Sequence, residues 1–213
     1  MLKQITLVFA TLALSAAAFA QQDHRFQIGF AANLNIGDSE INISNDGLQG
    51  GFYNNNTTGL GAGNICVNVF TFDPSEEEVS CCACLVTPNA LVSLSAKNDL
   101  INNVLTPAIP TSIVIKLYES IPTTATGGAK TVCNPTIVPV TVGNGMLAWG
   151  TTLEPSATPG TYGPVNVPFI NGTENFTSEI TDLFQVCSFV QQEGTGFGVC
   201  NSCALGALSG TKQ

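Results

Sequence analysis

The segment EEEVSCCACLVTPN, residues 76–89, holds three of the eight cysteines of this 213-residue chain. Cys81 and Cys82 are adjacent, so their Cα atoms are about 3.8 Å apart, closer than a disulfide bond between them normally allows. If the segment is a β-strand, Cys82 and Cys84 point to one face of its sheet and Cys81 points to the other. All three then need partners elsewhere in the chain, and the segment is predicted to join distant parts of the fold.

The other five cysteines are the pool of partners. They are Cys66, Cys133, Cys187, Cys200 and Cys203. An even number of cysteines in an exported chain favours a disulfide framework, and we predict that all eight are disulfide-bonded. The spacing leaves the connectivity open among on the order of 100 full pairings.

Two other uses of these thiols stay open at this point. The sulfurs of CCAC (residues 81–84) and CNSC (residues 200–203) are enough for a zinc site, and the CNSC pair alone has the spacing of a redox-active dithiol. Structural zinc sites are more typical of reducing compartments, so we assign no metal site, no catalytic residue and no cofactor.

The first twenty residues have the pattern of a secretory signal peptide. Lys3 is followed by an apolar run over residues 5–18, and Ala18-Phe19-Ala20 has the small-x-small form that precedes cleavage. The apolar run is short for a membrane anchor, which is the alternative interpretation. We predict a secreted product, located outside the cell, on its surface or in the periplasm, with no transmembrane segment in the mature chain.

The charge of the chain argues against nucleic acid as a partner. The chain has fifteen acidic residues and six Lys or Arg, which gives a formal net charge of −9. The lysines are scattered singly along the sequence, so no basic stripe is available to hold phosphates.

Short alternating segments separated by turn residues dominate the mature sequence. ICVNVFTF (65–72) and TSIVIKLYES (111–120) are the clearest strands, and Phe26, Ile28 and Phe30 alternate in the same way. Strands do not alternate regularly with helices, which favours an antiparallel β-sandwich or jelly roll. The predicted domains are the signal peptide at 1–20, N-terminal strands with a Gly/Asn-rich loop at 21–64, and a β-sandwich domain with a C-terminal helix at 65–205.

One late segment has helical instead of strand periodicity. TSEITDLFQVCSFVQQ (177–192) places apolar side chains at helical spacing, with Thr177 or Ser178 available as the N-cap. The residues on this stripe are Ile180, Leu183, Phe184, Cys187 and Val190. We therefore predict an amphipathic helix that lies on the sheet, with Cys187 on its buried face.

Few side chains in the sequence suggest catalysis. His24 is the single histidine, which excludes mechanisms that need a histidine pair, and no nucleophile-elbow or phosphate-loop motif occurs. The carboxylates that a glycosidase-like hydrolase would need are scattered and cannot be paired from the sequence; the candidates are Asp73, Glu119, Glu154 and Glu179.

Two further features have a structural interpretation. The acidic run DPSEEE (73–78) lacks the ligand spacing of a calcium loop and is predicted to be a solvated turn. Trp149 is predicted to be a core anchor and not a surface plate for a sugar.

Four stretches together resemble a group of exported, cysteine-rich bacterial proteins to which no function is attached. They are GNICVNVFTFDP (63–74), CCACLVTPNALVSLS (81–95), LTPAIPTSIVIKL (105–117) and GFGVCNSC (196–203), and the CCxC-LVTPN stretch is the most specific. The resemblance implies a bacterial, exported origin and recurring cysteine positions. It implies no activity, ligand or catalytic residue.

The sequence thus predicts a secreted or cell-surface protein with a structural, adhesive or interaction role, without enzymatic activity. Its expected partners are other copies of itself or cell-surface proteins, and residues 25–45 are a candidate strand for assembly by strand addition. Pairing of that segment within its own sheet is the simpler alternative. The alternative functions are a secreted hydrolase with paired carboxylates and an extracellular carbohydrate- or metal-binding module.

Overall fold

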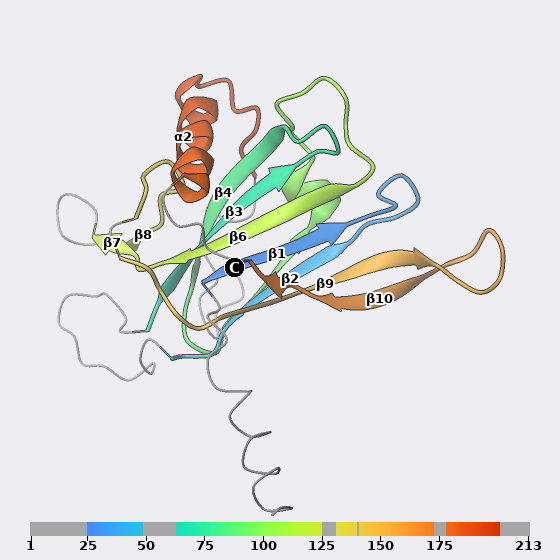
Figure 1. Cartoon of the computed structure of the whole chain (residues 1–213), viewed down its shortest axis with the longest axis horizontal. Helices are drawn as coiled ribbons and strands as arrows, with labels where there is room; N and C mark the ends of the chain where they lie inside the picture. Colours follow the sequence, from blue (N-terminus) through green and yellow to red (C-terminus); the bar gives the residue numbers. More distant parts are fainter. Residues whose placement is uncertain (1–24, 49–62, 125–130, 140, 173–177, 201–213) are drawn as a thin grey trace, which may run out of the picture.

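The computed structural model describes residues 25–48, 63–124, 131–139, 141–172 and 178–200. The predicted signal peptide, His24, Cys203 and most of the predicted Gly/Asn-rich loop lie outside the described residues. Within them the chain forms two antiparallel sheets, a small hairpin and one late α-helix (Figure 1). The predicted fold class, mainly antiparallel β with one late helix, is confirmed.

The larger sheet, sheet A, has five described strands in the order β11-β1-β6-β3-β4, each antiparallel to its neighbours. Their bounds are Phe26–Ala31 for β1, Ile65–Phe72 for β3, Glu78–Val86 for β4, Ile113–Ser120 for β6 and Ile170–Asn171 for β11. β-Branched and aromatic residues are frequent in β3 and β6, which have strands on both sides, as expected for residues that pack well on a pleated surface.

The smaller sheet, sheet B, has four described strands in the order β10-β9-β2-β5. Their bounds are Glu40–Asn45 for β2, Leu91–Ser95 for β5, Met146–Pro155 for β9 and Tyr162–Pro168 for β10; a separate hairpin joins β7 (Thr123–Thr124) to β8 (Thr131–Val132). The edge strand β10 contains Pro164 and Pro168, which lack the N–H that a further strand would need. Figure 1 shows β9 and β10 extending beyond the other strands.

The two sheets share an apolar core. Alternate residues of each strand point inward, as Ile65, Val67 and Val69 do in β3 and Ile41 and Ile43 do in β2, and all five are completely buried. Completely buried side chains of this size each contribute about 1.5–3 kcal/mol relative to an exposed position.

The chain passes from sheet B to sheet A through Phe169, which closes one side of the sandwich. Its ring lies against Gly29 of β1, and a Cβ atom at residue 29 would come within 2.4 Å of it. The close approach of this ring explains why glycine occupies that position.

The helix α2 (Glu179–Gln192) covers the outer face of sheet A, beside β4 and β3 (Figure 1). It buries the five predicted positions, Ile180, Leu183, Phe184, Cys187 and Val190, so the predicted amphipathic stripe is confirmed. Ser178 precedes the first helical residue, but its side chain makes no capping hydrogen bond.

Residues 25–45 belong to the sandwich itself. β1 lies between β6 and β11 in sheet A, and β2 lies between β9 and β5 in sheet B. The segment considered for strand addition to another subunit therefore has partners on both sides within its own chain.

Phe184 makes the central aromatic contact between α2 and sheet A. The centroid of its ring lies 5.2 Å from that of Phe70 and 5.8 Å from that of Tyr118, and both contacts are edge-on.

We expect Phe184→Ala to lower the free energy of unfolding by about 3–5 kcal/mol because it leaves a cavity among buried rings. Phe189 on the same helix is 62% exposed, so Phe189→Ala is the matched control, with an expected change of about 0.5 kcal/mol or less. Urea denaturation measures both, and equal losses would contradict this packing.

Candidate functional site

The three clustered cysteines lie in β4 and point to both faces of sheet A. Cys81 belongs to the apolar cluster beneath α2, whereas Cys82 and Cys84 belong to the core between the sheets. All three are buried. The alternation predicted from an extended CCAC segment is therefore confirmed.

Disulfide bonds, predicted from the cysteine count, are present. Among the described residues three are defined: Cys66–Cys133, Cys81–Cys187 and Cys82–Cys200, with Cα–Cα distances of 5.4, 5.8 and 5.4 Å. Cys84 is also disulfide-bonded. Two adjacent residues of β4 are thus bonded to segments more than 100 positions away, Cys81 to α2 and Cys82 to the segment after it.

Later segments of the chain also cover the outer edge of β4. Cys81 N–H donates to the carbonyl oxygen of Gly198 (2.8 Å), and Cys200 N–H donates to the carbonyl oxygen of Cys81 (3.3 Å), which forms a short parallel bridge. Leu105 N–H donates to the carbonyl oxygen of Val79 (3.0 Å) just before this bridge. These segments satisfy backbone groups that an edge strand would otherwise present to another chain.

Glu78, the first residue of β4, is a buried acid. It is only 8% exposed, and its Oε1 atom has no hydrogen-bond partner. Burial raises the pKa of this carboxyl to about 8, against a smaller lowering by the charge of Lys116. The solvated-turn interpretation of residues 73–78 is therefore wrong for Glu78, although it holds for Glu76 and Glu77, which are exposed.

Lys116 is the cation nearest to this acid, but it is engaged elsewhere. Its Nζ atom lies 2.5 Å from Oε1 of Glu179, the first residue of α2, and 4.8 Å from the centroid of the Phe72 ring. Among the described residues Glu78 therefore has no ion pair, as expected for a carboxyl that keeps its proton at neutral pH.

Glu78 also belongs to a cluster with the composition of a metal site. One carboxylate oxygen of Glu78 and the sulfurs of Cys81 and Cys187 all lie within 4.8 Å of one another. The two sulfurs are bonded to each other, however, and metals bind cysteine as the thiolate. The zinc alternative needs the thiolates of CCAC and CNSC as ligands. The structure instead joins Cys82 of the first motif to Cys200 of the second in a disulfide bond.

The carboxylates considered for a hydrolase lie on four different elements. Asp73 is in the turn after β3, where its Oδ1 atom accepts hydrogen bonds from the backbone of that turn; Glu179 pairs with Lys116. Glu119 is buried in β6, where its Oε2 atom accepts from Met146 N–H at 2.9 Å, and Glu154 is in β9.

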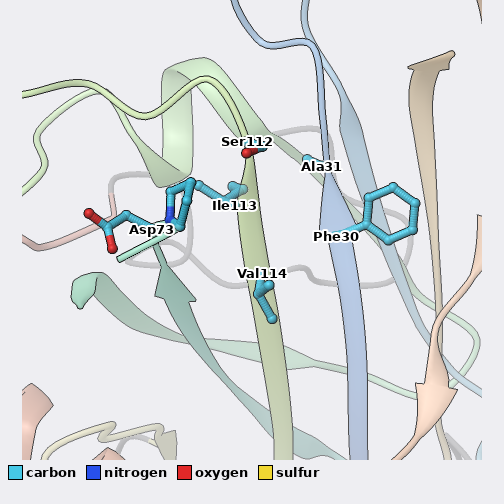
Figure 2. Close-up of a pocket in the computed structure, with 7 residues that line it drawn as sticks. Phe30, Ala31, Asp73, Ser112, Ile113 and Val114 are labelled. Atoms are coloured by element: carbon cyan, nitrogen blue, oxygen red, sulfur yellow. The ribbon is translucent and has the colours of Figure 1, made fainter. Parts of the chain in front are cut away.

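A pocket of about 270 Å³ lies between β1, the start of β6 and the turn after β3 (Figure 2). Figure 2 shows Phe30 and Ala31 on β1, Ser112, Ile113 and Val114 at the start of β6, and Asp73 on the side away from Phe30. The lining is mostly apolar and is completed by Pro74.

The pocket continues into an apolar surface on the outer face of sheet A. Phe30 and Val114 are cross-strand partners that are 42% and 41% exposed, and Ile28 pairs with Ile170, which is 67% exposed. We call Phe30, Val114 and Ile170 the β1 patch; Ile28 is half-buried and packs against the apolar cluster beneath α2. The sequence placed Phe30 on one apolar face with Phe26 and Ile28, but it gave no sign that α2 covers this face only at the Phe26 end.

Trp149 lies on the outer face of sheet B and not in the core. It is half-buried and belongs to neither apolar cluster, so the core-anchor interpretation is wrong. Its neighbours across the strands include Asn42 and Pro168. Thr151, two residues on, donates a hydrogen bond to Oδ1 of Asn166.

In the described part of the chain, no helix is long and apolar enough to cross a membrane. A comparison of the sequence and the structure with family models, curated proteins and solved structures finds no match.

The raised pKa of Glu78 predicts how stability changes with pH. The unfolded chain loses this proton near pH 4.5, whereas the folded chain keeps it until about pH 8. The free energy of unfolding should therefore fall as the pH rises between these values, because the folded state binds more protons. We expect Glu78→Gln, which stays neutral, to remove this fall.

Urea denaturation at several pH values from about 5 to 8.5 measures this difference. Glu77→Gln, at the exposed neighbouring position, is the matched control and should retain the wild-type slope. Parallel curves for wild type and Glu78→Gln would show that Glu78 ionises normally in the folded protein.

Proposed function

We propose that this is a secreted interaction protein, structural or adhesive and not enzymatic, which binds a cell-surface protein through the β1 patch and its pocket. The single observation that carries the proposal is the position of Phe30 and Val114. They are large apolar side chains, paired across strands, exposed, and next to a preformed apolar cavity.

The disulfide bonds support the extracellular part of the proposal. Disulfide-bonded β-proteins are typical of oxidising compartments, and buried bonds of this kind keep a fold intact outside the cell. The bonded cysteines hold β4, α2 and the segment after α2 together, and that rigid frame leaves the β1 patch at the opposite side of sheet A.

The size and lining of the pocket support recognition of a protein side chain. A volume of about 270 Å³ is below the range usual for drug-sized ligands, about 300–1,000 Å³. An apolar side chain of a partner would enter it, and the exposed Phe30 ring and the aliphatic side chains of the β1 patch would surround that anchor, as in many interface cores.

The test is binding of the labelled mature protein to cells of the producing organism and to their isolated envelopes. We expect saturable binding that Phe30→Ser weakens by about 10-fold or more, because it removes an aromatic anchor. Ile137→Ser is the matched control, since Ile137 is 63% exposed and lies outside the patch. No saturable binding, or equal losses in both variants, would contradict the proposal.

A second candidate function is supported by the outer face of sheet B. Trp149 lies among hydroxyl and amide side chains on this sheet, and hydrogen bonds from Ser93 and Thr151 occupy the Oδ1 atoms of Asn42 and Asn166. The amide N–H groups remain as donors beside an aromatic ring. This combination suits a sugar, whose C–H face stacks on the ring while its hydroxyls accept hydrogen bonds.

Binding to a panel of soluble polysaccharides, measured by affinity electrophoresis, tests this second function. We expect Trp149→Ala to weaken binding by about 10-fold or more, equivalent to about 1.4 kcal/mol. Leu147→Ala is the matched control, because Leu147 lies on the same face two residues away and is 40% exposed. If no polysaccharide binds the wild-type protein, this second function is wrong.

A further inference from the structure

The carboxyl of Glu78 lies directly against the Cys81–Cys187 disulfide. The acid and both sulfurs are within 4.8 Å of one another, both cysteines are completely buried, and Oε1 of Glu78 has no hydrogen-bond partner. Burial of an oxygen atom that lacks a partner among the described residues costs stability, because its desolvation is not compensated.

Formation of the Cys81–Cys187 disulfide requires a thiol to lose its proton in an apolar environment. A disulfide closes when a thiolate attacks the other sulfur, and apolar surroundings raise the pKa of a buried thiol. Cys81 lies among the aromatic and aliphatic side chains beneath α2. As α2 docks, it displaces the solvent that would otherwise accept the proton of the Cys81 thiol.

Among the described residues, Glu78 is the group placed to accept that proton. Lys116 on β6 is cationic and pairs with Glu179 on α2. Gln191 on α2 directs its side-chain amide at the two sulfurs, at 3.6 Å from Cys187 and 4.0 Å from Cys81, and an amide is not a base at neutral pH. The segment 198–200 that pairs with β4 carries no acid or histidine.

We propose that Glu78 is the general base for closure of the Cys81–Cys187 disulfide, taking the proton of the Cys81 thiol as α2 docks. Cys187 enters the step as a mixed disulfide with glutathione, formed from oxidised glutathione. The Cys81 proton passes to the Glu78 carboxylate, and the Cys81 sulfur attacks the Cys187 sulfur. The bond between Cys187 and glutathione breaks, and glutathione leaves as a thiolate that takes a proton from water.

The change in environment of Glu78 favours this transfer. In the unfolded chain the acid has its ordinary pKa near 4.5 and is ionised at pH 7, and its burial in the folded chain raises the pKa to about 8. The carboxylate thus becomes a stronger base at the moment when the thiol must be deprotonated. A pKa near that of a thiol suits efficient proton transfer, and the neutral product is the form that the buried site accepts.

Oxidative refolding of the reduced mature chain in a glutathione buffer tests the role of Glu78. Samples are quenched with a thiol-alkylating reagent, and mass spectrometry of the peptides reports the closed fractions of Cys187 and of Cys133. The Cys66–Cys133 bond in the same molecule is the internal control. At pH 7 we expect Glu78→Gln to slow closure at Cys187 by about 10-fold and to change closure at Cys133 by less than about 2-fold.

Two further measurements separate proton transfer from a structural role. Glu78→Asp should recover part of the rate at Cys187, because it restores a carboxylate. In the wild-type chain, the ratio of the Cys187 rate to the Cys133 rate should fall between pH 7 and pH 9, since thiols then ionise without a base. Unchanged closure at Cys187 in Glu78→Gln, equal slowing at both cysteines, or a pH-independent ratio would overturn the proposal.

Discussion

Adjacent residues of a β-strand point to opposite faces of the sheet, and in β4 this rule places Cys81 and Cys82 in two separate environments. Each cysteine is bonded to a segment more than 100 residues away, one to the helix and one to the segment after it. A single dipeptide therefore holds the helix on one face of sheet A and the segment at Cys200 against the other. The position of β4 at the sheet edge makes both attachments accessible, because later segments reach it from the side.

The same region shows how a rigid scaffold imposes unusual chemistry on one side chain. Glu78 begins β4, so pairing of the strand and docking of α2 bury its carboxyl regardless of the cost of desolvation. The nearest cation is held by Glu179. An acid in this position is neutral at physiological pH, and its neighbours are the two sulfurs of a disulfide. The binding surfaces that we propose lie elsewhere, on the β1 patch and the outer face of sheet B, so recognition and covalent bonding occupy separate parts of the sandwich.

The features that could be predicted from the sequence are those set by local periodicity. Alternation in residues 65–72 and 111–120 predicted strands, and the spacing of Ile180, Leu183 and Phe184 predicted the helix and its buried face. The opposite directions of Cys81 and Cys82 also follow from alternation alone. What could not be predicted depends on which elements meet in space. Alternation put Phe30 on an apolar face, but only the docked position of α2 leaves it exposed. Glu78 belongs to an acidic run, and the sequence gives no sign that the fold buries it beside Cys187 of the late helix. Trp149 has the apolar side chain of a core residue, but the register of β9 places it opposite Asn42 on the outer face of sheet B.

The attachment of Cys187 and Cys200 to β4 also fixes an order of events during synthesis. A chain is made from its N-terminus, and β4 emerges with its three thiols long before Cys187 and Cys200 exist. In that interval, Cys66 and Cys133 are the other cysteines available for oxidation. Incorrect bonds are therefore expected in the growing chain, and thiol–disulfide exchange must remove them before the helix can be attached. The bonds to Cys187 and Cys200 can therefore close only after most of the chain has been made, later than the bond between Cys66 and Cys133.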